Sequence, residues 1–153
     1  MRVLFVCSGN TCRSPLAEVL FRRMLQEAGR PDVIIGSAGS AAIDGAPASE
    51  GAYLVALEQG LDLSGHRARL LTRDLVEDAD VILAMSRGHL ARLERLGAKD
   101  RAHLLGEYAG VTGGGAEVRD PFGSDVETYR ATLMQLRVLL ASARDRLLAE
   151  QGR

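Results

Sequence analysis

The sequence predicts an α/β protein of three layers, in which helices cover both faces of a four-stranded parallel sheet. Four short apolar runs alternate with helical segments along the 153 residues. The runs are rich in Val, Ile and Leu, as strands buried on both faces of a parallel sheet are. Alternating strands and helices favour parallel pairing through right-handed crossovers. We expect residues 1–153 to form a single domain.

Each element has its own signal in the sequence. The expected strands are the apolar runs at residues 3–6, 33–35, 81–84 and 102–105. The first helix starts at Ser14-Pro15, because proline suits the first helical position, and it stops at Gly29. The other expected helices are 49–59, 73–78 with Leu75 inward, 86–96, and a long one from 126 whose apolar residues are spaced by three and four.

The remaining segments predict turns and loops. Thr72 and Ser86 look like N-caps of the helices that follow them. Small residues at 36–48 predict a surface loop beside the carboxyl ends of the strands, where ligand sites of such sheets lie. We expect irregular structure at 61–69 and 110–115 and a turn at 120–123.

Composition narrows the classes of protein. A net charge of -1 with 46% hydrophobic residues gives no reason to expect binding to nucleic acid or to a membrane. The first apolar run, about five residues long, is too short for a signal segment or a membrane span. Two cysteines make no disulfide framework, and no Cys/His cluster has zinc spacing. We therefore expect a cytoplasmic protein. We also expect a monomer that uses no metal and no cofactor.

Residues 6–15, VCSGNTCRSP, join the first strand to the first helix. Backbone N–H groups from Ser8 to Arg13 and the positive end of the helix can converge on Cys7 and stabilise its thiolate. Arg13 adds a fork of donors that matches two phosphoryl oxygens. Gly9 and Asn10 tolerate a left-handed backbone, and a Ser14 hydroxyl can donate to the sulfur. The segment predicts an oxyanion site with a cysteine nucleophile.

Two other interpretations of this loop were weighed. A Cys–Arg pair at this spacing arises often by chance, and Cys7 can be a small apolar residue at a strand end. Its place between a buried strand and a helix start favours the catalytic interpretation. The nucleotide-binding pattern GxxxxGK[ST] is absent from the sequence, and GxGxxG does not follow the first strand.

The chain resembles the low-molecular-weight protein tyrosine phosphatases. The resemblance rests on VLFVCSGNTCRSPLAE at 3–18, SAG at 37–39, HRAR at 66–69, DVILAM at 80–85 and DPFG at 120–123. It implies that Cys7 attacks phosphorus and forms a phosphocysteine while Arg13 and the loop amides hold the phosphoryl oxygens. Asp120 would protonate the leaving group and then activate water.

The resemblance also assigns supporting roles. Substrate contacts would come from Ser8, Gly9, Asn10, Thr11, Cys12, Ser14 and Phe122, and a hydrogen-bond network supporting the loop would include Asn10, Ser14, Ser37 and His66. Cys12 would be a backup thiol able to form a disulfide with Cys7. No role is assigned to His89 or His103.

The phosphorylated side chain is the open question. The family's tyrosine phosphatases often carry Ile or Leu where Thr11 stands and two Tyr after Asp-Pro, where this chain has Phe122 and Gly123. Thr11, EYAGVTGGG and DPFG look more like the bacterial protein-arginine phosphatases. A small polar Thr11 leaves room for a guanidinium, and Asp120 can pair with it. We favour protein phosphoarginine, with protein phosphotyrosine as the alternative.

Two further classes are less favoured. An arsenate reductase on this fold uses redox cysteines outside the loop, and this chain has only Cys7 and Cys12. A non-catalytic phosphate-binding module needs neither a nucleophile nor an acid, yet Cys7 and Asp120 are both present. In each interpretation the loop binds phosphate or a similar oxyanion.

Overall fold

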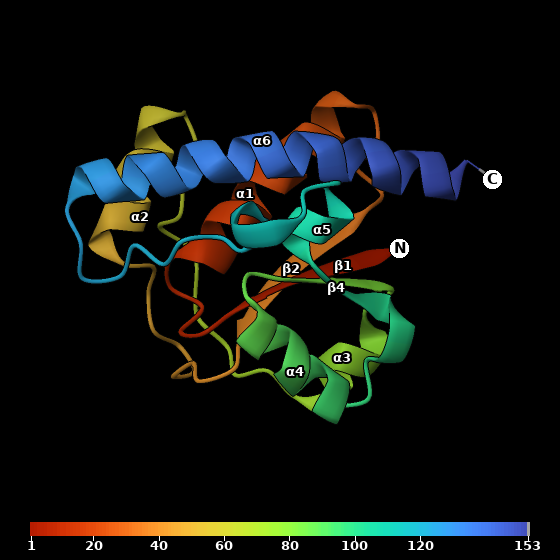
Figure 1. The fold of residues 1–153 in the computed structure, drawn as a ribbon. Coiled ribbons are helices and arrows are strands. Elements are labelled where there is room, and N and C mark those ends of the chain that lie inside the picture. Colours follow the sequence, from red (N-terminus) through yellow and green to blue (C-terminus); the bar gives the residue numbers. More distant parts are fainter. Residues whose placement is uncertain (153) are drawn as a thin grey trace.

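The computed structural model describes residues 1–152, and in this part of the chain four parallel strands form one sheet (Figure 1). The strands are β1 (Arg2–Cys7), β2 (Ile34–Gly39), β3 (Val81–Ala84) and β4 (Ala102–Leu104). Their order is β2-β1-β3-β4, and every neighbouring pair is parallel. Because β1 is an inner strand, its carboxyl end, with Cys7, opens in the middle of the sheet edge.

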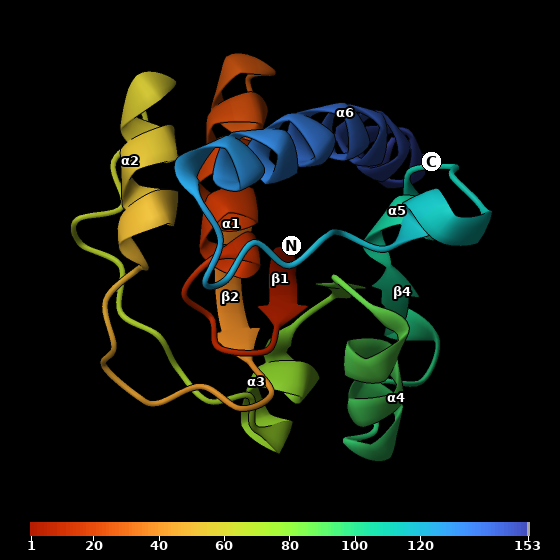
Figure 2. The same cartoon turned by 60° about the vertical axis from the view of Figure 1, so that its left-hand side comes forward.

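Helices cover both faces of the sheet, which confirms the predicted three layers (Figures 1 and 2). One face carries α1 (Arg13–Glu27), α2 (Glu50–Glu58), α5 (Leu105–Tyr108) and α6 (Val126–Gln151). The other carries α3 (Arg73–Asp78) and α4 (Arg87–Arg95). Short 3₁₀ turns lie at η1 (Lys99–Arg101) and η2 (Gly113–Ala116).

Each face of the sheet has its own hydrophobic core. Alternate residues of β1 point to opposite faces, so Val3 and Phe5 join the core under α1 and α6 while Leu4 and Val6 join the core under α3 and α4. Phe5 meets Phe21 of α1 edge-to-face at 5.5 Å between ring centroids. The central strand is therefore buried on both faces, as its continuous apolar run predicted.

The helices differ in whether a side chain caps their N-terminus, and this difference matters for the site. The helices α2, α3, α4 and α6 begin after side chains that accept a hydrogen bond from a backbone N–H of the first turn: Ser49, Thr72, Ser86 and Asp125. Helix α1, by contrast, begins after Cys12 with no side-chain cap and no acidic residue in its first turn. Its first N–H groups are left for another acceptor.

Within the described residues, no helix combines the length and the apolar character that crossing a membrane requires.

Some expected boundaries were wrong. Residues 36–39 belong to β2 instead of the predicted loop, because their small side chains let the strand continue into register with β1 as far as Cys7. The fourth strand ends at Leu104, and Leu105 starts α5, so the run 102–105 spans two elements. In α3, Leu75 packs against the core as expected and is partly buried, while Val76 beside it is fully buried. Part of 110–115 forms η2.

Gly51 and Gly88 give a matched test of helix packing, because each is the second residue of its helix. A Cβ on Gly51 would lie 2.5 Å from the ring of Tyr129, whereas one on Gly88 would meet only Ser86 Oγ at 3.7 Å. We expect Gly51→Ala to lower the free energy of unfolding by about 1–2 kcal/mol through overpacking of α2 against α6. Gly88→Ala should be neutral or gain up to about 1 kcal/mol from helix propensity. Urea unfolding measures both, and equal effects would contradict the packing argument.

Candidate active site

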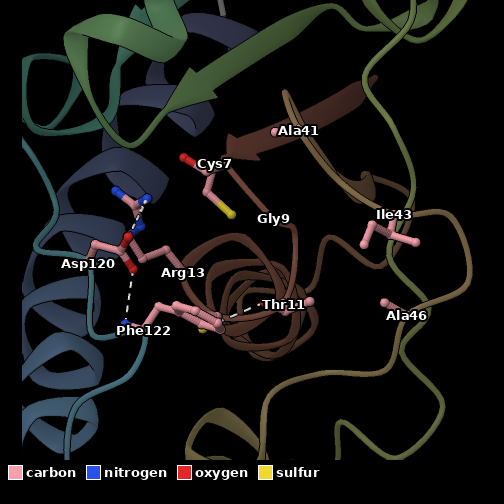
Figure 3. Close-up of a pocket in the computed structure, with 11 residues that line it drawn as sticks. Cys7, Gly9, Thr11, Arg13, Ala41, Ile43, Ala46, Asp120 and Phe122 are labelled. Atoms are coloured by element: carbon pink, nitrogen blue, oxygen red, sulfur yellow. Dashed lines mark hydrogen bonds and ion pairs between the residues drawn. The ribbon is translucent and has the colours of Figure 1, made fainter.

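A cavity of about 380 Å³ opens beyond the carboxyl ends of the strands, with Cys7 facing it (Figure 3). The loop from Cys7 to Arg13 forms its base, and residues from 41–46 and from 120–122 form its sides. Its lining residues are Cys7, Ser8, Gly9, Thr11, Cys12, Arg13, Ala41, Ile43, Ala46, Asp120 and Phe122. The structure therefore brings together all three predicted catalytic residues, which lie up to 113 positions apart (120 − 7).

The carbonyl groups of the loop are held from outside it. Within the described residues, no backbone N–H of residues 8–13 donates to a protein acceptor. The carbonyls instead accept bonds from other segments, so the amides are left to converge on a ligand, as in an anion-binding nest. The four pairs are Ser40 N to Cys7 O at 2.9 Å, Ala41 N to Ser8 O at 2.9 Å, His66 Nε2 to Asn10 O at 2.7 Å and Ser49 N to Thr11 O at 2.9 Å.

Asn10 fixes the shape of the loop. It is fully buried and adopts a left-handed backbone with φ of 56°. Its amide nitrogen donates to Ser14 Oγ at 2.8 Å and to Ser37 Oγ at 2.9 Å, and its oxygen accepts from the backbone N of Arg69 at 3.0 Å. Ser37 in turn donates to Glu18. The network implied by the resemblance is thus present in the structure, with Arg69 and Glu18 as members that sequence reasoning missed.

Cys7 lies at the floor of the cavity. Its side chain is nearly buried, and its Sγ lies 2.8 Å from Ser14 Oγ. Because Ser14 Oγ already accepts from Asn10, its own proton is free to donate to the sulfur. This is the contact that a thiolate at this position requires.

Arg13 and Asp120 form one wall of the cavity (Figure 3). Arg13 is 6% exposed and donates to the carbonyl of Val118 at 3.3 Å, which holds the guanidinium in place. Its Nη2 lies 3.5 Å from Asp120 Oδ2. The Asp120 side chain is 52% exposed, and its other oxygen accepts from Phe122 N at 3.1 Å. A fixed cation and an accessible carboxyl group therefore share the cavity with the thiol.

The rim of the cavity is apolar on two sides. Phe122 is 71% exposed and Ile43 is 78% exposed, and they stand on different sides of the opening, with Thr11 between them in Figure 3. Sequence reasoning predicted Phe122 as a single wall and missed Ile43. The sequence does mark Ile43, because it is the one large apolar residue in a segment of small residues.

The carboxyl end of β2 touches the loop directly. A Cβ on Gly39 would lie 2.4 Å from the carbonyl oxygen of Ser8 and 2.9 Å from the amide nitrogen of Asn10. Only a residue without a side chain permits this approach of two backbones. Gly39 thus sets how closely the loop packs against the sheet.

The Cys12 thiol contacts the start of α2 and the helix α6. Its Sγ lies 3.2 Å from Ser49 Oγ and 3.4 Å from Tyr129 Oη, at the start of α2 and in α6. Both cysteines are free thiols and are buried. Burial, with the Cys12 contact, raises the pKa of Tyr129 to about 12, so its hydroxyl stays protonated. Disulfide formation with Cys7 remains a prediction.

His89, to which the sequence assigned nothing, lies behind the loop. Its Nε2 is 2.8 Å from Ser8 Oγ, and its Nδ1 is 2.9 Å from Ser86 Oγ. Burial, followed by the charge of Arg13, lowers the pKa of His89 to about 4. The imidazole is therefore neutral near pH 7. The one hint in the sequence is that His89 lies just after the junction between the third strand and the following helix, at the carboxyl edge of the sheet.

Among residues 1–152, no group of three or more His, Cys, Asp or Glu side chains is arranged to hold a metal ion. The cationic group facing the cavity is the guanidinium of Arg13.

These features define a parallel α/β protein with a cysteine in an anion-binding loop. A family model described as low molecular weight phosphotyrosine protein phosphatase matches residues 2–151, and the chain belongs to this family. A protein-arginine-phosphatase of Geobacillus stearothermophilus is 38% identical over 98% of both chains. A low molecular weight protein-tyrosine-phosphatase, PtpB of Staphylococcus haemolyticus, is 38% identical over 94% of this chain and 98% of its own.

One solved structure of the same fold carries a phosphoryl group on its active-site residue. It is a YwlE arginine phosphatase in which the active-site cysteine is replaced by a phosphorylated serine. It is 35% identical, covers 99% of this chain and 95% of its own, and superposes with a TM-score of 0.84.

The lowered pKa of His89 predicts a pH dependence of stability. Since the unfolded chain binds a proton near pH 6.5 and the folded protein only near pH 4, stability is full above pH 6.5 and falls as the pH drops towards 4. The loss attributable to His89 is on the order of 3 kcal/mol. Urea unfolding from pH 7 to pH 4.5 should therefore show a steeper decline for the wild type than for His89→Gln. Parallel curves would refute a neutral, buried His89.

Proposed function

We propose that this protein is a cysteine-dependent protein phosphatase that hydrolyses phosphoarginine in protein substrates. The observation that carries the proposal is the placement of Cys7 Sγ at the base of a loop whose amides donate to no protein acceptor, beside the buried guanidinium of Arg13. A phosphoryl group in this loop would present its phosphorus to the sulfur and its oxygens to the surrounding donors.

In the first step the thiolate of Cys7 attacks phosphorus in line. The S–P bond forms while the bond from phosphorus to the guanidinium nitrogen breaks, and Asp120 gives its proton to the leaving nitrogen. The exposed side of Asp120 faces the opening through which the substrate would extend. Arg13 and the loop amides stabilise the charge on the three equatorial oxygens.

In the second step water hydrolyses the phosphocysteine. Asp120, now ionised, takes a proton from the attacking water. The water oxygen bonds to phosphorus, and the P–S bond breaks. Inorganic phosphate and the free thiolate result, and Ser14 is placed to donate to the departing sulfur. The phosphorylated serine in the related YwlE structure supports a covalent intermediate at the equivalent position.

The choice of phosphoarginine over phosphotyrosine as the proposed substrate rests on the cavity and on the relatives. Thr11 lines the cavity with a small polar side chain, which leaves space and an acceptor for a planar guanidinium. The carboxyl group of Asp120 can pair with the same cation. The Geobacillus relative, a protein-arginine-phosphatase, matches over nearly its whole length.

Phosphotyrosine is the second candidate, and two observations favour it. The Staphylococcus haemolyticus relative is a tyrosine phosphatase with the same identity of 38%. The rim also offers two exposed apolar side chains, Phe122 and Ile43, between which a phenyl ring can lie. The rim therefore suits an aromatic substrate, while Thr11 deeper in the cavity suits a guanidinium.

The chemical roles are tested by two substitutions. Cys7→Ser should lower kcat for phosphate release by about 10³-fold or more, because the hydroxyl is a much weaker nucleophile. Asp120→Asn should lower kcat by about 10²-fold on phosphopeptides that have a basic leaving group. Asp74→Asn on α3 is the matched control and should leave both rates unchanged. Full activity of Cys7→Ser would rule out the covalent mechanism.

Substrate preference is tested with matched phosphoarginine and phosphotyrosine peptides. We expect the wild type to have the higher kcat/KM on phosphoarginine. Thr11→Ile should fill the space for the guanidinium and shift the ratio towards phosphotyrosine by about tenfold or more. Thr112→Ile, at an exposed threonine outside the cavity, should leave the ratio unchanged. A wild-type preference for phosphotyrosine would instead establish the second candidate.

A further inference from the structure

A chain of three polar side chains runs from the start of α4 to the floor of the cavity. Ser86 Oγ lies 2.9 Å from His89 Nδ1, and His89 Nε2 lies 2.8 Å from Ser8 Oγ. Ser8 immediately follows Cys7 and lines the cavity with an exposed side chain, whereas His89 is 7% exposed. One end of this chain therefore faces the substrate, and its middle is shielded from water.

The hydrogen bonds indicate the direction in which the protons point. Ser86 Oγ accepts from the backbone N of His89 at 3.4 Å as the cap of α4, so its hydroxyl proton is available for Nδ1. A neutral imidazole that accepts at Nδ1 carries its proton on Nε2 and donates it to Ser8. The lowered pKa of His89 keeps the ring neutral near pH 7. Ser8 Oγ accepts from the ring, which turns its own proton towards the cavity.

The same histidine lies where three parts of the site meet. Val118 N donates to Met85 O at 2.9 Å, and Arg87 N donates to Glu117 Oε2 at 2.8 Å, so the start of α4 is tied to the segment that leads to Asp120. The charges of Arg13, Asp120 and Glu117 all act on the ring of His89. Its position is thus set by the acid-bearing segment as well as by the phosphate-binding loop.

We propose that His89 is a positioning residue that holds the Ser8 hydroxyl as an additional donor to the phosphoryl oxygens. This role rests on the proposed phosphatase function, because it assigns Ser8 to the anion that the loop would bind. The loop amides are fixed by the backbone, but a serine hydroxyl rotates freely unless a partner restrains it. His89 supplies that restraint from the buried side.

The proposal predicts that Ser8 and His89 act as one unit. With an aryl phosphate such as para-nitrophenyl phosphate, Ser8→Ala and His89→Leu should each lower kcat/KM by about tenfold, the effect of one hydrogen bond to a charged group. The double variant should lose about tenfold, not a hundredfold, since the two residues share one interaction. His89→Gln keeps a donor and Ser8→Thr keeps a hydroxyl, so both should remain within about threefold of wild type.

Two controls separate this role from general damage to the fold. His103→Leu, at a partly buried histidine that packs on Tyr108, should leave kcat/KM unchanged. In a Cys7→Ser background, calorimetry should show weaker binding of inorganic phosphate after either Ser8→Ala or His89→Leu, by the same factor in both. This binding measurement does not depend on turnover.

The outcomes are distinguishable. If the wild type hydrolyses neither the aryl phosphate nor a phosphopeptide, the proposed function fails, while phosphate calorimetry still tests the pair. If Ser8→Ala matches wild type in rate and in phosphate binding, Ser8 is no donor and the inference is wrong. Multiplying losses in the double variant, or no rescue by His89→Gln, would also overturn it, because His89 would then act independently of Ser8.

Discussion

The site depends on one constraint, namely that the carbonyl groups of the Cys7–Arg13 loop point outward. Peptide groups place N–H and C=O on opposite sides, so holding each carbonyl from outside turns the neighbouring amide towards the centre. The donors that hold them come from the segment after β2, from His66 and from Ser49 at the start of α2. Connecting segments of the chain therefore hold the loop in shape through hydrogen bonds. The loop can adopt this shape only when the sheet and its crossover connections are in place.

The sequence predictions were accurate where a feature depends on residues close together in the chain, and inaccurate where it depends on contacts between distant segments. The buried strands, the helix starts and the Cys7 loop are encoded locally, by apolar runs and by residues within a few positions of one another, and they could be predicted. Among the partners of the loop, Ser37 and His66 were expected only through the family resemblance. The others could not be predicted, because they arise from contacts across the chain: Ser8 meets His89 over 81 positions. Ile43 shows the same limit, since an apolar residue in a loop gains meaning only once the fold sets it at the rim. Boundary errors, as at Gly36–Gly39, came from reading small residues as flexible when the sheet uses them for close packing.

The cavity divides into two regions with different physical character. At the floor, Cys7 and Arg13 are buried, Cys7 Sγ contacts Ser14 Oγ and Arg13 donates to Val118 O, so both side chains are restrained. At the rim, Phe122 and Ile43 are largely exposed and have few restraints. In the proposed function, the floor would carry the reaction chemistry, and the choice of phosphorylated side chain would depend on the rim and on Thr11.

The missing cap of α1 has a thermodynamic consequence. The first N–H groups of this helix lack the hydrogen-bond compensation that a side-chain cap gives to the start of α2. An oxyanion supplies it, and it binds the folded chain but not the unfolded one, so its binding energy adds to the stability of the fold. Inorganic phosphate would then be a folding ligand as well as a reaction product. The protein's resistance to unfolding in a cell would track the local phosphate concentration.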